Sequence, residues 1–215
     1  MSSRRNLVAR DQAVTPFSST LMRFCEGTAA LGAALVDSQG ETVDYAGALE
    51  PFDIKVAAAE WRLVLDVTLR TRSFGWSETN QLVVRGQRHS FVVVPLSEGY
   101  ALVAQLERHA FDVSNRAVAE AVRELSREAG LEMPSCWECE RWARVEVMPC
   151  TNDPRRPQAL WRDGRWQWLE ILGRFSAGDL PERETGYRAQ LEDGGDITII
   201  RERLGVWYAS DLPDV

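Results

Sequence analysis

Apolar residues in the first part of the chain recur at helix and strand spacings. Thr15-Pro16 is typical of a helix N-cap and first helical residue, Gly27 is typical of a helix end, and the apolar stripe between them consists of Phe17, Leu21 and Phe24. A short apolar run, 31–36, and an alternating stretch, 41–45, with Val43 and Tyr45 on one face, flank Asp37-Ser38-Gln39-Gly40, which predicts a hairpin. The fold is therefore expected to begin with a helix and a hairpin.

The stretch from Pro51 to about Arg70 predicts a second helix that has two apolar stripes. At about 100° per residue, the broad stripe holds Ile54, Ala57, Ala58, Trp61, Val64, Leu65 and Leu69, and the narrow stripe holds Val56, Leu63 and Val67. Polar residues separate the stripes, with Lys55, Arg62, Asp66 and Arg70 on one side and Asp53 and Glu60 on the other. A helix that covers a sheet needs only one apolar face. The narrow stripe therefore needs a further partner, either a segment of the same chain or a second copy.

Three strands and a third helix complete this part of the chain. The spans 82–85, 90–94 and 100–106 predict a meander, with turns at Gly86-Gln87 and at 95–99. Ser114 is expected to cap a helix that ends at Gly130 and whose core-facing residues are Val118, Ala121, Val122, Leu125 and Ala129. The predicted order is α-β-β-α-β-β-β-α, an α+β sandwich over residues 14–131.

This order resembles the roadblock/dynein-light-chain family. The resemblance is carried also by three phrases: Gly32-Ala33-Ala34-Leu35-Val36-Asp37 before a tight turn, Phe91-Val92-Val93-Val94-Pro95-Leu96, and Gly99-Tyr100-Ala101-Leu102-Val103-Ala104. Members of the family are typically homodimers that pair their central helices and an edge strand of each sheet. Several bind small Ras-like GTPases on the helical face, and the family has no catalytic signature. The resemblance therefore implies a non-catalytic adaptor or regulator.

Carried over by position, the resemblance also implies site residues. The dimer interface would include Val56, Leu63 and Val67 on the central helix and Leu82 and Val84 on the paired strand. The GTPase would contact the charged edge of the same helix, at Lys55, Glu60, Arg62, Asp66 and Arg70. This chain departs from the family by Phe74 and Trp76 in the loop 71–79 and by a further domain. PAS and GAF domains share a helix-covered antiparallel sheet, so a small-ligand sensor stays open as an alternative.

The composition changes from Pro134 onward, where six of the eight tryptophans lie. We expect a boundary near 132–135 and a separate module over 134–215. Asp163-Gly164 and Asp193-Gly194-Gly195 are hairpin signals, which predicts a mostly-β module, either an SH3-like barrel or a curled sheet. Its tryptophans are expected mainly in the core, because a small domain needs large side chains to bury enough area. The alternative is a peptide- or nucleic-acid-binding barrel carried by a dimer.

Motifs for catalysis and for metal binding are scarce. The sequence lacks a GxxxxGK[ST] phosphate loop, a GxSxG elbow and an HExxH helix. The only histidines, His89 and His109, are expected in exposed polar roles near turns and strand ends. Cys136, Cys139 and Cys150 form an incomplete zinc set, because a structural zinc takes four ligands. We therefore predict no enzymatic activity, no cofactor and no metal.

Charge and the N-terminal segment set the remaining expectations. The net charge of −7 makes nucleic acid an unlikely partner, because binding to phosphates is driven by clustered positive charge. Residues 1–13 are expected to form a flexible tail, and no apolar segment follows Arg4 and Arg5 as a secretion signal would require. No apolar run is long enough to span a membrane. A cytoplasmic protein without membrane insertion is therefore predicted.

Overall fold

The computed structural model of the chain describes residues 11–28, 30–71, 79–107, 110, 113–134, 142–162, 164–175, 184–202 and 204–210. The chain divides into two compact units, Met1–Cys139 and Glu140–Val215. The first unit contains helices and strands, and the described part of the second unit contains strands.

The first unit has the order of elements that the sequence predicts. Along the chain they are α1 (Pro16–Gly27), β1 (Ala30–Val36), β2 (Thr42–Gly47), α2 (Pro51–Arg70), β3 (Leu82–Arg85), β4 (Ser90–Pro95), the 3-10 turn η2 (Ser97–Gly99), β5 (Ala101–Leu106) and α3 (Asn115–Ala129). The strands form one antiparallel sheet in the order β2-β1-β5-β4-β3. The prediction of α-β-β-α-β-β-β-α is confirmed, and β3, β4 and β5 form the expected meander.

The predicted helix ends are also confirmed. The Thr15 hydroxyl accepts a hydrogen bond from the backbone N–H of Ser18, and Pro16 is the first residue of α1. Ser114 caps α3 in the same way through the N–H of Ala117, at 3.1 Å. Gly130 ends α3 with φ at 69°, a left-handed conformation that glycine adopts without steric cost.

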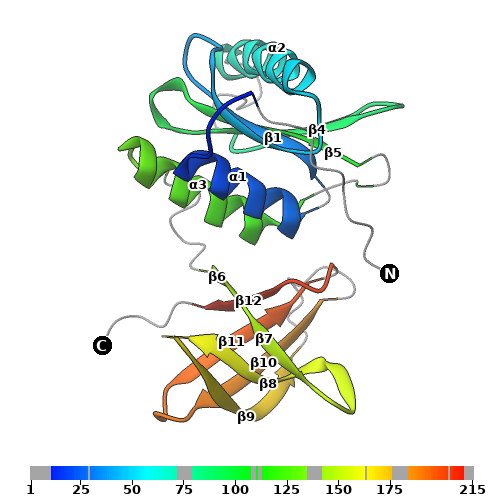
Figure 1. The fold of residues 1–215 in the computed structure, drawn as a ribbon, viewed down its shortest axis with the longest axis vertical. Coiled ribbons are helices and arrows are strands. Elements are labelled where there is room, and N and C mark those ends of the chain that lie inside the picture. Colours follow the sequence, from blue (N-terminus) through cyan, green and yellow to red (C-terminus); the bar gives the residue numbers. More distant parts are fainter. Residues whose placement is uncertain are drawn as a thin grey trace. The chain divides into compact units, whose positions relative to one another are not determined.

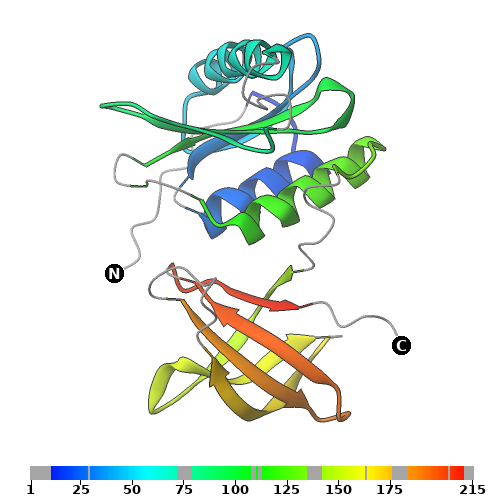
Figure 2. The same ribbon diagram turned by 180° about the vertical axis from the view of Figure 1, so that it is seen from behind.

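The sheet of the first unit lies between two helical layers. Helix α2, cyan in Figure 1, covers one face, and α1 and α3 lie side by side on the other, as Figure 2 shows from behind. Under α2, the side chains of Ile54, Ala58 and Leu65 pack against strand residues such as Val93 and Val103. This part of the broad stripe faces the core as predicted. Val64 does not, because its side chain is exposed, so its predicted placement in the core-facing stripe is wrong.

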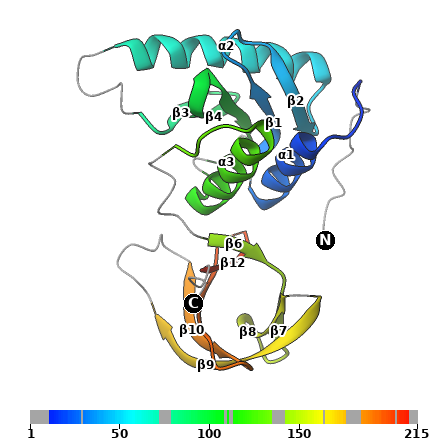
Figure 3. The same ribbon diagram turned by 90° about the vertical axis from the view of Figure 1, so that its left-hand side faces the viewer.

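The second unit is one antiparallel sheet. Its strands are β6 (Trp142–Val145), β7 (Val147–Cys150), β8 (Asp153–Arg162), β9 (Arg165–Phe175), β10 (Thr185–Leu191), β11 (Asp196–Arg201) and β12 (Trp207–Ser210). Their order in the sheet is β6-β12-β11-β10-β9-β8-β7, so the two end strands are consecutive in the chain and meet at Glu146. The carbonyl of Glu146 accepts from the N–H of Trp161 at 2.8 Å. The sheet is therefore curled, as Figure 3 shows.

The interior of the curled sheet is filled mainly by aliphatic side chains. Leu160, Leu191, Ile199 and other inward residues form the core cluster, and Trp207 is its buried tryptophan. Trp161 and Trp168 are 43% and 51% exposed. The expectation that the tryptophans of this module lie mainly in its core is therefore wrong for these two, because the register of β8 and β9 points them outward.

Candidate functional site

The outer face of α2 carries a continuous exposed apolar stripe. Phe52, Val56, Leu63 and Val67 are 75%, 39%, 66% and 62% exposed, and the small Ala59 lies among them. We call these residues the α2 stripe. Three of them form the narrow stripe predicted from the sequence. Phe52 was missed, although it precedes Val56 by four residues and so lies on the same helical face.

Leu82 and Val84 lie on the edge strand β3 and face the α2 side of the sheet. In the register of β3 and β4, Leu82 is opposite Val93 and Val84 is opposite Phe91, whose ring lies 5.0 Å from that of Trp61. Leu82 packs partly against the core below α2, and Val84 is half-buried. Among the described strands β3 is the last in the sheet order, so its outer edge is where a further strand would join the sheet.

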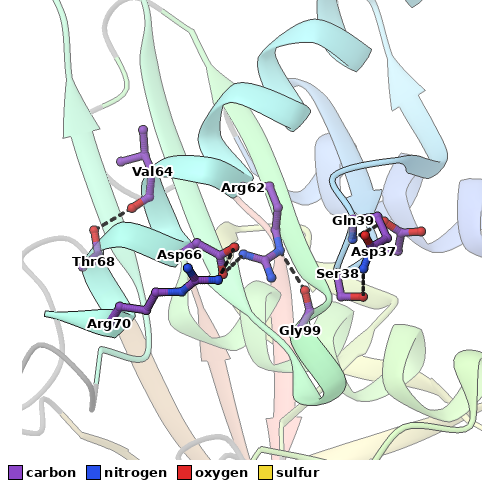
Figure 4. A network of polar contacts seen from close by, with 9 residues as sticks. All are labelled: Asp37, Ser38, Gln39, Arg62, Val64, Asp66, Thr68, Arg70 and Gly99. Carbon is purple, nitrogen blue, oxygen red and sulfur yellow. Dashed lines mark hydrogen bonds and ion pairs between the residues drawn. The ribbon is translucent and has the colours of Figure 1, made fainter.

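Arg62 does not lie on an exposed edge of α2, so this part of the predicted partner surface is wrong. Its side chain is buried, and Figure 4 shows that it reaches across to the turn between β4 and β5. Nε donates to the carbonyl oxygen of Gly99 at 2.7 Å, and Nη1 lies 2.5 Å from Oδ1 of Asp66. A helical-wheel pattern places Arg62 between the two stripes but cannot show the turn, which lies 37 residues further along the chain.

The turn that receives Arg62 is closely packed. Gly99 has φ at +81°, and a Cβ there would lie 2.9 Å from Cβ of Ser38 and 3.3 Å from Nη2 of Arg62. Ser97 Oγ, in the same turn, donates to the carbonyl of Glu132 at 2.6 Å. The β1–β2 turn, the β4–β5 turn and the middle of α2 therefore meet at Arg62.

Lys55 is also bound within the chain. Its Nζ lies 2.6 Å from Oδ2 of Asp11, and the hydroxyl of Tyr45 donates to the other oxygen of the same carboxylate. The hydrogen bond from Lys55, followed by that from Tyr45, lowers the pKa of Asp11. Burial, followed by the hydrogen bond to Asp11, raises the pKa of Tyr45. This arrangement ties the residues that precede α1 to β2 and α2.

The remaining charged residues beside the α2 stripe differ in how available they are. Glu60 is exposed, and the Arg70 side chain is 82% exposed with Nη2 at 3.8 Å from Asp66. Asp66 is held by Arg62 and is only 30% exposed. Of the five predicted partner-binding residues, Glu60 and Arg70 are therefore the two that a partner can reach most freely.

The described residues give little support for catalytic or metal chemistry. His89 lies beside a turn, as predicted, and its Nδ1 is 3.0 Å from the side-chain amide nitrogen of Gln105. Among the residues that the structure describes, no three His, Cys, Asp or Glu side chains gather as metal ligands would. Cys136, Cys139 and His109 lie outside the described residues, as do Phe74 and Trp76, so the predicted absence of metal stays a prediction. None of the described helices is long and apolar enough to cross a membrane.

Comparison with known proteins identifies similar solved structures over about half of the chain. No family model and no curated protein matches. Myxococcus xanthus MglB is 17% identical, with 55% of this chain and 98% of that chain covered and a TM-score of 0.48. A Roadblock/LC7 domain from Streptomyces avermitilis is 17% identical, covering 53% and 94%, with a TM-score of 0.41. The gliding protein MglB from Thermus thermophilus is 20% identical, covering 60% and 98%, with a TM-score of 0.45.

These comparisons concern fold and do not identify a partner for this chain. The similar structures include a Roadblock/LC7 domain, the family that the sequence resembles. The first unit has the order of elements and the antiparallel sheet that the sequence resemblance predicts, and a curled β module follows it.

Proposed function

We propose that this protein is a non-catalytic regulator or adaptor that homodimerises through α2 and binds a small Ras-like GTPase. The observation that carries the proposal is the α2 stripe, which is exposed on the central helix of a roadblock-like domain. Burying one side chain of this size is worth about 1.5–3 kcal/mol. An exposed stripe of such residues is a common mark of a protein interface.

A second copy of the chain is the occupant that best fits the stripe. A two-fold axis across α2 brings each stripe against its own symmetry mate, as an isologous interface requires. The stripe from Phe52 to Val67 spans about 22 Å at 1.5 Å per residue. Ala59 lies near its middle, where a small side chain lets two helices approach closely, and the larger side chains lie towards both ends.

The edge strand β3 supplies a second element of the proposed dimer. As the last strand in the sheet order, β3 can pair with β3 of a symmetry mate, which would extend the sheet across the axis. Leu82 and Val84 point to the α2 side of the sheet, so β3 and α2 present apolar groups on the same side. The dimer interface that we propose thus consists of Val56, Leu63, Val67, Leu82 and Val84, with Phe52 added.

The GTPase partner follows from the roadblock resemblance and from the charged rim of α2. Glu60 and Arg70 are available to a partner, with Asp66 and Lys55 partly available, and such a rim can steer association while apolar groups supply affinity. Arg62 is buried against Gly99 and is not free to insert into a GTPase. We therefore favour a regulator that orders the GTPase's own residues over one that supplies a catalytic arginine.

Light scattering at micromolar concentration tests the dimer. Leu63→Glu should give a folded monomer, because a charge would be buried without a partner at the interface. Leu204→Glu is the matched control, since Leu204 is 61% exposed in the second unit and should leave the dimer intact. A monomeric wild-type protein, or a Leu63→Glu variant that stays dimeric, would contradict the proposed interface.

Binding to purified GTPases tests the partner. Small Ras-like GTPases from the source genome are loaded with GDP or a non-hydrolysable GTP analogue and tested against the immobilised full chain. We expect one of them to bind in one nucleotide state, with Arg70→Ala weakening binding modestly. At saturation, Arg70→Ala should keep any stimulated hydrolysis within about tenfold of wild type, equivalent to about 1.4 kcal/mol of barrier. Absence of binding by every GTPase in both states would exclude this partner class.

A further inference from the structure

One end of the curled sheet has two arginines on its inner face. In the register of β11, Arg201 is directly opposite Thr185 of β10 and Trp207 of β12. In the register of β9 and β10, Arg174 is directly opposite Tyr187. Residues directly opposite each other share a face of the sheet, and Tyr187 and Trp207 belong to the core cluster inside the curl seen in Figure 3. Arg174 and Arg201 therefore lie on the inner face, at the end of the sheet where β9 and β11 finish.

The side chain of Arg201 is held against buried aromatic rings. Its guanidinium carbon lies 5.8 Å from the centre of the Trp207 ring, and that ring lies 6.4 Å from the ring of Tyr187. Tyr187 is fixed in turn, because its hydroxyl donates to the carbonyl oxygen of Arg155 at 3.1 Å. The Nη2 atom of Arg201 packs against the β11–β12 turn, where a Cβ on Gly205 would lie only 3.2 Å from it. The position of the guanidinium is therefore restricted on several sides.

The guanidinium of Arg201 has no counter-charge in its surroundings. Its Nε atom is buried and forms no hydrogen bond. Within the part of the chain that the structure describes, neither Arg201 nor Arg174 forms an ion pair. Removing part of a charged group from water without a compensating contact costs free energy, and a buried polar atom without a partner is rare in folded proteins. An anion at this end of the sheet would supply the missing charge.

The charges near the Tyr187 hydroxyl are mostly positive. Burial raises the pKa of Tyr187, and the carboxylate of Asp153 adds to this rise. Three guanidinium groups oppose the rise in this pKa, those of Arg174, Arg156 and Arg201. The ionised groups that act on the hydroxyl are thus three cations and one anion, an excess of two positive charges. A phosphate monoester carries about −1.5 to −2 at neutral pH, which matches this excess better than the single charge of a carboxylate.

We propose that this end of the curled sheet binds the phosphate group of a monoester through Arg201 and Arg174. Arginine suits this group, because its planar guanidinium can donate two parallel hydrogen bonds to phosphate oxygens. Contact with the Trp207 ring already restricts Arg201, so less side-chain freedom is lost when the phosphate binds. Ligand sites also occur in the mouths of β-barrels, which this end of the sheet resembles.

A single phosphate group fits this end of the sheet better than a nucleic acid. The net charge of −7 disfavours a long polyanion, whose binding requires many clustered cations. The phosphate can belong to a small molecule or to a phosphorylated protein side chain, since both present the same group. The proposal concerns the second unit alone, so it does not depend on the proposed dimer or on the GTPase partner.

An NMR titration of the full-length wild-type protein tests the proposal. The probes are inorganic phosphate, a Gly-Gly-phosphoserine-Gly-Gly peptide, acetate and a short oligothymidylate, compared at equal ionic strength. We expect the arginine Nε–H signals of Arg201 and Arg174 to shift saturably with inorganic phosphate or the phosphopeptide. Acetate and oligothymidylate should bind at least about tenfold more weakly. Tighter binding of the peptide than of inorganic phosphate would identify a phosphorylated protein as the source of the group, and the reverse order would identify a small molecule.

Variants locate the contact. Arg201→Gln should weaken phosphate binding at least about tenfold, and Arg201→Lys, which keeps the charge without the planar fork, should lie in between. Arg174→Gln should also weaken binding, and this exposed position tests the site even if Arg201→Gln does not fold. Arg188→Gln is the matched control, because Arg188 follows Tyr187 in β10 and is exposed on the opposite face of the sheet. It removes the same charge and should have no effect.

Three results would overturn the proposal. The first is the absence of a saturable shift of the Arg201 Nε–H signal at millimolar phosphate. The second is an equal loss of phosphate binding in Arg188→Gln and Arg174→Gln, which would indicate a general effect of charge. The third is tighter binding of acetate or oligothymidylate than of phosphate. Circular dichroism and the thermal midpoint establish that each variant is folded.

Discussion

Replacing Arg62 by alanine is expected to destabilise the first unit without removing the dimer interface. Arg62 joins α2 to the β4–β5 turn, because its guanidinium contacts the Gly99 carbonyl at 2.7 Å and the Asp66 carboxylate at 2.5 Å. The side chain is buried within a single chain, so its contacts do not depend on a partner. The effect of this substitution therefore distinguishes a residue that stabilises the domain from a residue that forms the dimer interface.

The expected loss of stability is about 2–4 kcal/mol. Removing the guanidinium takes the charged donor away from the carbonyl of the half-buried Gly99, and a hydrogen bond to a charged group contributes about 1.5–3 kcal/mol. Asp66 loses its closest ion-pair partner, but this carboxylate is 30% exposed and keeps Arg70 at 3.8 Å, so its contribution is at the low end of that range. The loss of packing by the aliphatic part of the arginine adds to both. Arg62→Lys keeps the charge but cannot reach both acceptors with a planar group, so an intermediate loss is expected.

Urea unfolding and calorimetry at one fixed protein concentration measure this loss, because dimerisation would otherwise make stability depend on concentration. Arg70→Ala is the matched control on the same helix. Its side chain is 82% exposed, and its effect should stay within about 0.5 kcal/mol. Light scattering should find Arg62→Ala in the same oligomeric state as the wild type. A change in stability below about 0.5 kcal/mol for Arg62→Ala would refute the buried-anchor interpretation.

Three further predictions concern the backbone, the N-terminal contact and the division of the chain. Gly47→Ala should severely destabilise the first unit, because φ of Gly47 is +120° and a Cβ would lie 2.4 Å from the Leu31 carbonyl oxygen. Gly40 also has a positive φ, +84°, but no atom lies within 4 Å of its Cβ position. Urea unfolding should therefore show a far smaller loss of stability for Gly40→Ala. The pKa of the Asp11 carboxyl should lie below 3.8 in an NMR titration and should return towards that value in Lys55→Met. Because folding lowers this pKa, the contribution of the carboxylate to stability is present above the unfolded pKa and is lost as pH falls through the folded pKa. Residues 11–133 expressed alone should unfold cooperatively in calorimetry, and an insoluble or molten fragment would count against independent units.

The elements of the first unit could be predicted because their signals are local. Thr15, Ser114 and Gly130 mark helix ends through hydrogen bonds or backbone angles within a few residues. The second apolar stripe of α2 could be predicted for the same reason, since helical periodicity alone separates it from the core-facing stripe. The structure shows in addition that the side chains of this stripe are exposed.

The environment of Arg62 and the direction of Trp161 could not be predicted, because both depend on contacts between distant segments. Arg62 lies at the border between the core and the surface of α2, and only the packing of the Gly99 turn decides that it is buried. Trp161 follows the equally apolar Leu160, so alternation allows either residue to face inward. The register of β7, β8 and β9 places Leu160 in the core and leaves Trp161 outside.

The charges that remain available along α2 restrict how a second copy can be placed. Lys55 is held by Asp11, and Arg62 is held by Gly99 and Asp66. The freely exposed charges are then acidic on one side of the α2 stripe, at Asp53 and Glu60, and basic on the other side, at Arg70. A two-fold axis perpendicular to α2 places the same side of the stripe from both copies together. Arg70 of one copy therefore does not pair with Asp53 or Glu60 of the other in the proposed antiparallel dimer. These charges stay at the rim of the interface, where the proposed GTPase would contact them.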